Sequence, residues 1–128
     1  MASKVPEDLR YSKEHEWLKV EGTRGRVGIT DHAQHQLTDI VYVKLPQVGQ
    51  AVKANDPLGE VESIKSVSAI YSPVSGKVVE VNKDLDKEPE RMNQDPYGKG
   101  WFVVLELTAP AEAGKLLDAA AYRAHIGE

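Results

Sequence analysis

The sequence predicts a mainly β protein: a small flattened barrel with short peripheral helices and a helical C-terminal region. Two observations support this fold class. The first is a pair of strand-like segments that meet at Lys65: residues 57–63 alternate apolar with polar side chains, and residues 67–71 are rich in strand-favouring residues. The second is an internal repeat on either side of that pair. Two such repeats packed face to face would form the barrel, with Lys65 at one end.

The repeat consists of residues 45–55 and residues 72–82, which align at one fixed offset. Each copy contains a Pro-x-x-Gly sequence that predicts a turn into a strand, and an asparagine that predicts the end of that strand. Repetition of this kind indicates two similar strand–turn units. The coinciding residues are Pro46 and Pro73, Gly49 and Gly76, Val52 and Val79, and Asn55 and Asn82.

Length and composition exclude several classes of protein. A chain of 128 residues fits one domain, expected to have a loosely ordered lead-in over residues 1–10 and a helical region over residues 110–126. No apolar run is long enough for a transmembrane helix. The net charge of −4, without a basic stripe, argues against a nucleic-acid partner. The absence of cysteine excludes disulfides and thiol catalysis.

The first half of the chain begins with two expected strands, residues 16–20 and 26–29, joined by a turn cluster. Trp17 is expected in the core. Thr30 is a good N-cap for a helix over residues 31–37. The other expected elements are strands over residues 39–45, 76–81 and 101–107, a polar connection over 84–95 with a short helix near 89–92, and helices over 110–117 and 119–126.

A metal site at the first helix is the less favoured interpretation of its histidines. His32 and His35 are three residues apart, on one helix face, and Asp31 is adjacent. A zinc site needs a third or fourth ligand at suitable spacing, and the sequence offers none. We therefore expect a solvated helix face.

Lys65 is the residue best placed for covalent modification. It lies between the two repeats at the tip of the predicted hairpin, whereas an exposed lysine elsewhere is ordinarily a solubility residue. A rigid hairpin would hold its amine in one position for a modifying enzyme. Neither glycine nor Asn-Gly occupies the turn, so the hairpin prediction depends on the flanking strands.

The order and spacing of several motifs resemble those of the lipoyl-carrying H proteins of the glycine cleavage system. The likeness covers nearly the whole chain and implies a lipoyl-domain-like barrel-sandwich hybrid. The motifs are His15-Glu16-Trp17, Glu62-Ser63-Ile64-Lys65 and the segments 27–34, 39–46, 72–76 and 93–101.

This resemblance implies that lipoate is joined to Lys65 through an amide. Glu62 and Gly76 match positions by which a lipoate ligase or octanoyltransferase recognises the site, and Glu16 would line the cleft that shelters the loaded arm. The chain would be no enzyme. It would act as a monomer that carries the aminomethyl group of glycine between glycine decarboxylase, aminomethyltransferase and dihydrolipoyl dehydrogenase, whose cofactors supply the chemistry. The expected location is the prokaryotic cytoplasm, or the mitochondrial matrix for a processed eukaryotic form.

Five positions depart from the family pattern. Ala69 stands where aspartate is common, which puts sheltering of the load in doubt, and Arg91-Met92 replace an apolar pair. Ser66 replaces alanine, a small-for-small change. Thr38 stands where the family usually has glycine. Because a left-handed backbone costs a non-glycine residue about 1–2 kcal/mol, we expect the helix to end differently here.

Other interpretations of Lys65 remain open at this stage. A lipoate relay protein would share the attachment site but not the load, and an unlipoylated interaction module would use neither. Biotin carriers flank their lysine with methionines, and neither Met1 nor Met92 is near Lys65. Lipoyl domains of 2-oxoacid dehydrogenases lack the His-Glu-Trp start and have long Pro/Ala linkers, which this chain does not.

Overall fold

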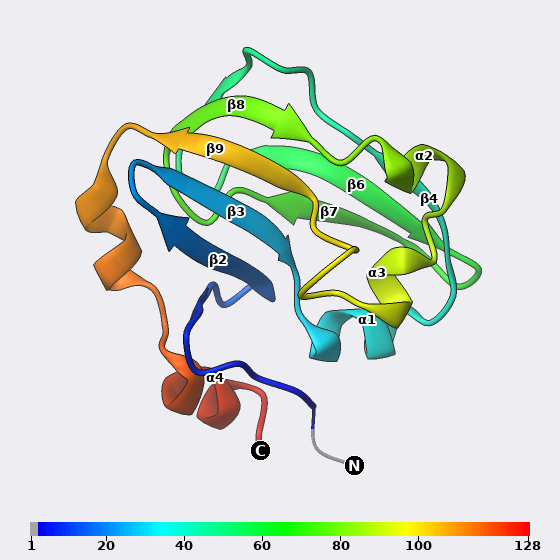
Figure 1. The fold of residues 1–128 in the computed structure, drawn as a ribbon. Helices are drawn as coiled ribbons and strands as arrows, with labels where there is room; N and C mark the ends of the chain where they lie inside the picture. The colour runs from blue at the N-terminus through cyan, green and yellow to red at the C-terminus, as the bar shows by residue number, and fades with distance from the viewer. Residues whose placement is uncertain (1–2) are drawn as a thin grey trace.

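A computed structural model describes residues 3–128 as two antiparallel sheets with short helices around them (Figure 1). One sheet has the strand order β1-β2-β3-β9-β8-β5 and the other β4-β6-β7. The prediction of a mainly β barrel-sandwich fold with peripheral helices is confirmed. The strands are β1 (Arg10–Tyr11), β2 (Glu16–Glu21), β3 (Arg24–Ile29), β4 (Ile40–Lys44), β5 (Ala51–Val52), β6 (Pro57–Ser63), β7 (Val67–Tyr71), β8 (Gly76–Val81) and β9 (Val103–Leu107).

The helices are short, and they surround the sheets. α1 (Asp31–Leu37) agrees with the prediction, and the Thr30 hydroxyl caps it by accepting a hydrogen bond from the Ala33 amide at 3.2 Å. The others are α2 (Asp84–Lys87), α3 (Arg91–Gln94), the 3₁₀ helix η1 (Pro110–Lys115) and α4 (Ala119–His125). None of the helices within residues 3–128 is both long enough and apolar enough to cross a membrane.

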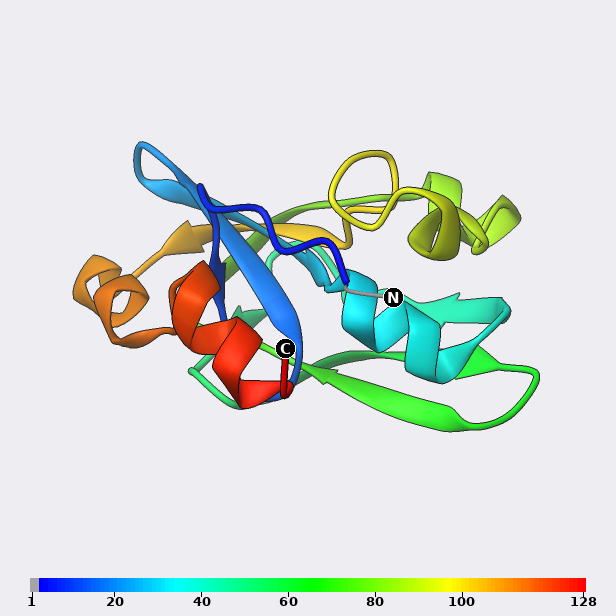
Figure 2. The ribbon, with the colours of Figure 1, turned by 90° about the horizontal axis from the view of Figure 1, so that it is seen from below.

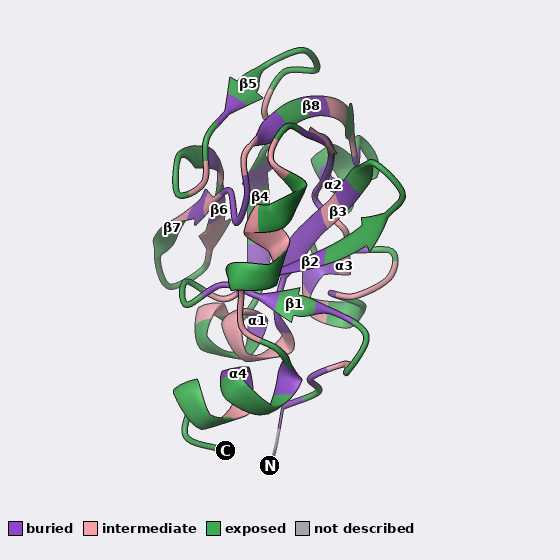
Figure 3. Ribbon diagram, turned by 90° about the vertical axis from the view of Figure 1, so that its left-hand side faces the viewer, coloured by how far each residue is buried: buried purple, intermediate pink, exposed green. Residues whose placement is uncertain are grey.

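Two clusters of buried side chains hold the fold together. The larger one lies between the sheets and includes Val27, Val61, Val78 and Phe102, all at most 1% exposed. In Figure 3 the buried segments run through the middle of the molecule, while turns and outer helix surfaces are exposed. The smaller cluster packs the N-terminal segment and Trp17 against α4, with Tyr11 stacked on Tyr122 at 4.7 Å between ring centroids.

The two sequence repeats pair with each other side by side, rather than face to face as predicted. β5 and β8 are antiparallel neighbours, with Ala51 opposite Lys77 and Val52 opposite Gly76. The Gly49 amide donates to the Val78 carbonyl at 2.7 Å, and the Gly49 φ of +98° needs glycine. Edge hydrogen bonding therefore joins the repeats in one sheet.

The segment predicted as a polar connection contains two helices instead of one. Leu85 in α2 and Met92 in α3 are both completely buried, so each short helix is fixed by one apolar side chain. Arg91, next to Met92, forms ion pairs with Asp84 and Glu88. The predicted helix over residues 110–117 is instead the tighter η1, which ends before an extended Leu116.

The N-terminal segment is packed rather than loosely ordered as far as the structure describes it. Val5 and Leu9 are 4% and 6% exposed. The Ser3 amide donates to the Glu128 carboxylate at 2.8 Å, which ties the segment to the C-terminal end of the chain. Figure 2 shows this segment running beside α4.

Replacing Thr38 by glycine is expected to stabilise the protein by about 1 kcal/mol, or roughly 4 °C in Tm. Thr38 has φ 63° and ψ −150°, a region almost reserved for glycine, so the expectation that the helix ends differently is wrong. The Asn93 side chain fixes this geometry by donating to the Thr38 carbonyl at 2.7 Å. Thermal unfolding would measure the gain, with Thr38→Ala as the control that keeps the strain. A Thr38→Gly variant no more stable than Thr38→Ala would contradict it.

Candidate functional site

Lys65 is exposed at the tip of the hairpin formed by β6 and β7, as the sequence predicts. Glu62 pairs with Val67 in the last register position of the hairpin, so residues 63–66 make the tip. The tip lies at the edge of the molecule, away from α4 in both views (Figures 1 and 2). The amine is therefore open to an approaching protein.

The tip is ordered by a serine that sequence reasoning missed. The Ser63 hydroxyl oxygen accepts hydrogen bonds from the Lys65 and Ser66 amides, both at 3.1 Å. The Ser63 amide donates to the Ser66 carbonyl at 2.8 Å. Serine hydroxyls stabilise turns in this way, so a serine two residues before Lys65 was the available signal.

The tip is also tethered to the C-terminal end of α1. The Ile64 amide donates to the Asp39 carbonyl at 3.0 Å, and the Lys65 ammonium donates from Nζ to the Gln36 carbonyl at 3.2 Å. A cation is favourable at the C-terminus of a helix, because the last carbonyls carry partial negative charge. The backbone and the amine of Lys65 thus both have partners.

Exposed apolar side chains gather on the sheet that carries Lys65. Tyr42, Glu62 and Val67 lie in one cross-strand row, and Tyr42 and Val67 are 51% and 61% exposed. Val41 and Ile64 are 53% and 70% exposed. Exposed apolar side chains that lie together are typical of a surface that meets another protein.

Gly76 lies in the other sheet, at the start of β8, where neighbouring backbones approach closely. A Cβ atom at Gly76 would lie 2.7 Å from the Glu106 carbonyl oxygen and 3.1 Å from the Leu105 Cβ. This geometry gives Gly76 a packing reason that is independent of recognition by a ligase.

Gly76→Ala is expected to lower the free energy of unfolding by about 1–3 kcal/mol, because β8 and β9 must separate to admit the methyl group. Chemical denaturation would measure the loss. Gly114→Ala is a matched control, since a Cβ there meets no atom within 4 Å. If Gly76→Ala proved as stable as Gly114→Ala, the packing explanation would fail.

Glu16 is buried, with 2% of its surface exposed, so its carboxylate is not a solvent-facing cleft wall. It accepts hydrogen bonds from the Ser12 hydroxyl and from the Tyr71 amide, the latter at 3.2 Å. Burial raises the Glu16 pKa to about 7, although both hydrogen bonds act in the opposite direction. Glu16 therefore joins the start of β2 to the end of β7, roughly 17 Å along the strand from the hairpin tip.

Ala69 stands at the position where the family commonly has aspartate. Ala69 is half-buried in β7 and pairs with Glu60 of β6. The row Lys44, Glu60 and Ala69 lies two residues along the strands from the row of Tyr42, on the same face of the sheet. A carboxylate is thus present one strand away from the usual position, on Glu60.

The two α1 histidines have different surroundings. His35 lies 3.6 Å from Asp31, and the His32 ring packs against His15 at 4.9 Å between centroids, so only His35 fits the predicted solvated face. Within residues 3–128, no group of three or more His, Cys, Asp or Glu side chains is arranged to hold a metal ion.

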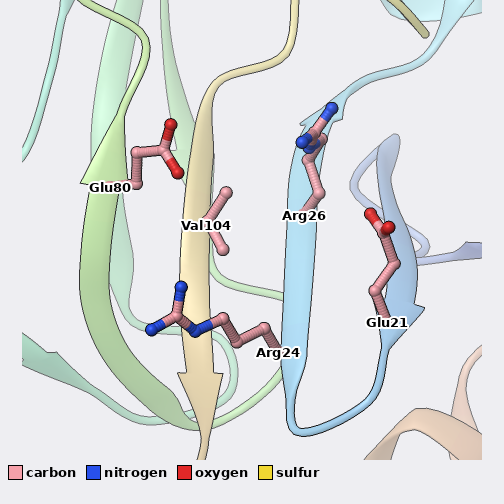
Figure 4. A pocket seen from close by; sticks show the side chains of 5 residues that line it. All are labelled: Glu21, Arg24, Arg26, Glu80 and Val104. Atoms are coloured by element: carbon pink, nitrogen blue, oxygen red, sulfur yellow. The ribbon is translucent and has the colours of Figure 1, made fainter.

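A hollow on the outer face of the six-stranded sheet offers no comparable site. Figure 4 shows its lining, in which arginines and glutamates alternate around Val104. Arg24 pairs with Glu106 at 3.1 Å, and the Arg26 guanidinium lies over Trp101 at 5.2 Å from the ring centroid. Because the charges are mixed and partly paired, the hollow has no clear preference for an anion or a cation.

Known proteins match this chain along almost its whole length. Residues 9–128 match the family model described as glycine cleavage H-protein. The glycine cleavage system H protein of Symbiobacterium thermophilum is 60% identical over 124 residues, 97% of each chain. That of Bacillus subtilis is 54% identical over 118 residues, 92% of this chain and 93% of that one. The crystal structure of a glycine cleavage system H protein from Mycobacterium marinum has a TM-score of 0.89 at 41% identity, covering 97% of this chain and 100% of that one.

Proposed function

The chain belongs to the glycine cleavage H-protein family, the lipoyl carriers of the glycine cleavage system, and from this premise we propose that Lys65 is the residue that bears the lipoyl group. The observation that carries the proposal is the exposed Lys65 at the ordered tip of the β6–β7 hairpin. The protein is a carrier and not a catalyst.

The residues around Lys65 fit a covalently attached arm. The amine is exposed, and its one described hydrogen bond, to the Gln36 carbonyl, breaks without leaving a buried group unsatisfied, since Gln36 is also exposed. Lipoate, when attached, supplies a dithiolane that is reduced as it takes up the aminomethyl group. This chain contributes the position of the arm and the surface that the partners meet.

Glu62 and Gly76 support this attachment in different ways. Glu62 is the acidic residue nearest the tip in β6 and lies between Tyr42 and Val67, where an approaching ligase or octanoyltransferase can reach it. Gly76 permits the close approach of β8 and β9. We propose that Glu62 is contacted directly, whereas Gly76 acts through the fold.

Glu16 acts on the arm site from within the protein. Its hydrogen bond to the Tyr71 amide fixes the end of β7, the strand that leads away from Lys65. We propose that it shapes one wall of the cleft for the arm by holding this strand.

The partners follow from the proposed load. Glycine decarboxylase, aminomethyltransferase and dihydrolipoyl dehydrogenase would each receive the arm, and the exposed apolar side chains beside Lys65 give them a surface to contact. The curated relatives are bacterial, so we place the protein with these enzymes in the cytoplasm, acting as one carrier domain.

Ligase treatment of the purified protein tests the attachment site. With lipoate and ATP, the wild-type chain is expected to gain one lipoyl group on the peptide that contains Lys65. Lys53→Arg, which changes another exposed lysine, should be modified like the wild type. A lipoyl group found on another residue, or none with an active ligase, would refute the assignment.

A further inference from the structure

We propose that Ser63 is a positioning residue for the modification of Lys65, acting through the backbone of the hairpin tip. This inference rests on the proposed attachment at Lys65. It assigns to the Ser63 hydroxyl the task of holding the Lys65 Cα in one place while the side chain reacts.

The tip needs such support because its turn is not one that hairpins favour. Ile64 and Lys65 alone connect Ser63 to Ser66, and neither has a positive φ. The two-residue turns that match the twist of paired strands need one or two residues with positive φ. The tip therefore does not have one of the turns that match the strand twist.

The Ser63 hydroxyl supplies the missing constraint. Its oxygen accepts from two successive amides, Lys65 and Ser66, each at 3.1 Å. The same hydroxyl lies 3.3 Å from the Ser66 carbonyl, to which it donates. One side chain thus satisfies three backbone groups around the lysine, at a tip that is otherwise exposed.

The hydrogen bond from Lys65 Nζ to the Gln36 carbonyl cannot hold the tip during the reaction. The amine must leave that carbonyl and lose a proton before its lone pair attacks the acyl carbon of lipoyl adenylate, formed by the ligase from lipoate and ATP. The N–C bond forms, and the C–O bond to the adenylate phosphate breaks with its electron pair on oxygen. A second proton then passes from the nitrogen to solvent, and the amide nitrogen keeps the third. The bonds of the Ser63 hydroxyl, together with the backbone bonds of Ser63 and Ile64, then hold the tip.

Ser63→Ala is expected to raise the KM of lipoate ligase for the carrier about tenfold with kcat nearly unchanged, because the enzyme must select the ordered tip from a mixture. Amide exchange at Lys65 and Ser66, followed by NMR, should accelerate about tenfold in the unmodified protein. Ser63→Thr, which keeps the hydroxyl, should restore both values. Ser68→Ala, at an exposed serine in β7, is the matched control.

A Ser63→Ala protein with wild-type KM and wild-type exchange would overturn the proposal, as would a KM increase that Ser63→Thr does not reverse. A wild-type chain that is modified elsewhere than Lys65 would instead overturn the proposed function. The two failures are thus distinguishable, since the first requires a wild type that is modified at Lys65.

Discussion

Lys65→Arg is expected to abolish glycine cleavage while leaving the fold intact. Arginine keeps the positive charge and reaches toward the Gln36 carbonyl, but a guanidinium stays protonated and cannot form the lipoyl amide. Because Lys65 is exposed, its replacement removes no core contact. Glycine-dependent release of carbon dioxide and ammonia, measured with the other three purified components, should fall to the level without carrier.

Lys53→Arg is the matched control, since it makes the same change at an exposed lysine outside the hairpin. Both variants should unfold at the wild-type temperature. Substantial activity from a folded Lys65→Arg protein would mean that another residue bears the load.

Glu16→Gln is expected to gain stability relative to the wild type as pH rises, by roughly 3 kcal/mol between pH 4.5 and 7. In the wild type, burial raises the Glu16 pKa from 4.5 to about 7. In that window the native protein holds a proton that the unfolded chain has released. Wild-type stability contributed by Glu16 is therefore present below pH 4.5 and lost as pH rises through 7, whereas glutamine has no such dependence.

The stability of Glu16→Gln must be compared with that of the wild type, because the pKa shift of His15 changes stability with pH in the opposite direction. Burial, followed by the nearby His32 and His125, lowers the His15 pKa, so its contribution to stability is lost as pH falls below about 6.5. Subtracting the wild-type curve from the Glu16→Gln curve removes this effect. Denaturant unfolding at several pH values would give both curves, with Glu21→Gln as an exposed control on β2. A constant difference across pH 4.5–7 would contradict the assignment of a raised pKa to Glu16.

The hairpin and α1 were predictable because local signals and tertiary structure agree there. β7 is rich in strand-favouring residues, and Thr30 is both a good N-cap by type and the observed cap. The repeat also predicts two strand–turn units, and each copy contains one strand, β5 or β8. Its pairing as neighbours in one sheet could not be derived, since a fixed sequence offset does not distinguish stacking from edge hydrogen bonding.

Other features depend on contacts between distant segments. Leu85 and Met92 are single apolar residues in a polar stretch, so no periodicity marks the helices that they anchor. The buried Glu16 carboxylate accepts hydrogen bonds from Ser12 and from Tyr71, a residue 55 positions away. Thr38 retains the glycine-like backbone because Asn93, on α3, holds its carbonyl. In each case tertiary packing overrides local preference.

Some features of the candidate site could likewise be predicted from the sequence, and others depend on the structure. Lys65 and its place at a hairpin tip follow from the sequence. For Ser63 the sequence offers only a residue type that favours turns, and the structure adds its two amide contacts. Gly76 was assigned to recognition by likeness, and the structure adds a packing reason in the nearby Glu106 carbonyl.

Tandem mass spectrometry of the loaded carrier tests the central claim most directly. The lipoylated protein would be incubated with glycine decarboxylase and carbon-labelled glycine, then digested and fragmented. We predict that the labelled aminomethyl group lies on the lipoyl arm of the Lys65 peptide and nowhere else. A lipoylated Lys65 that takes up no glycine carbon from an active decarboxylase would contradict the carrier role and favour a protein that only passes lipoate on.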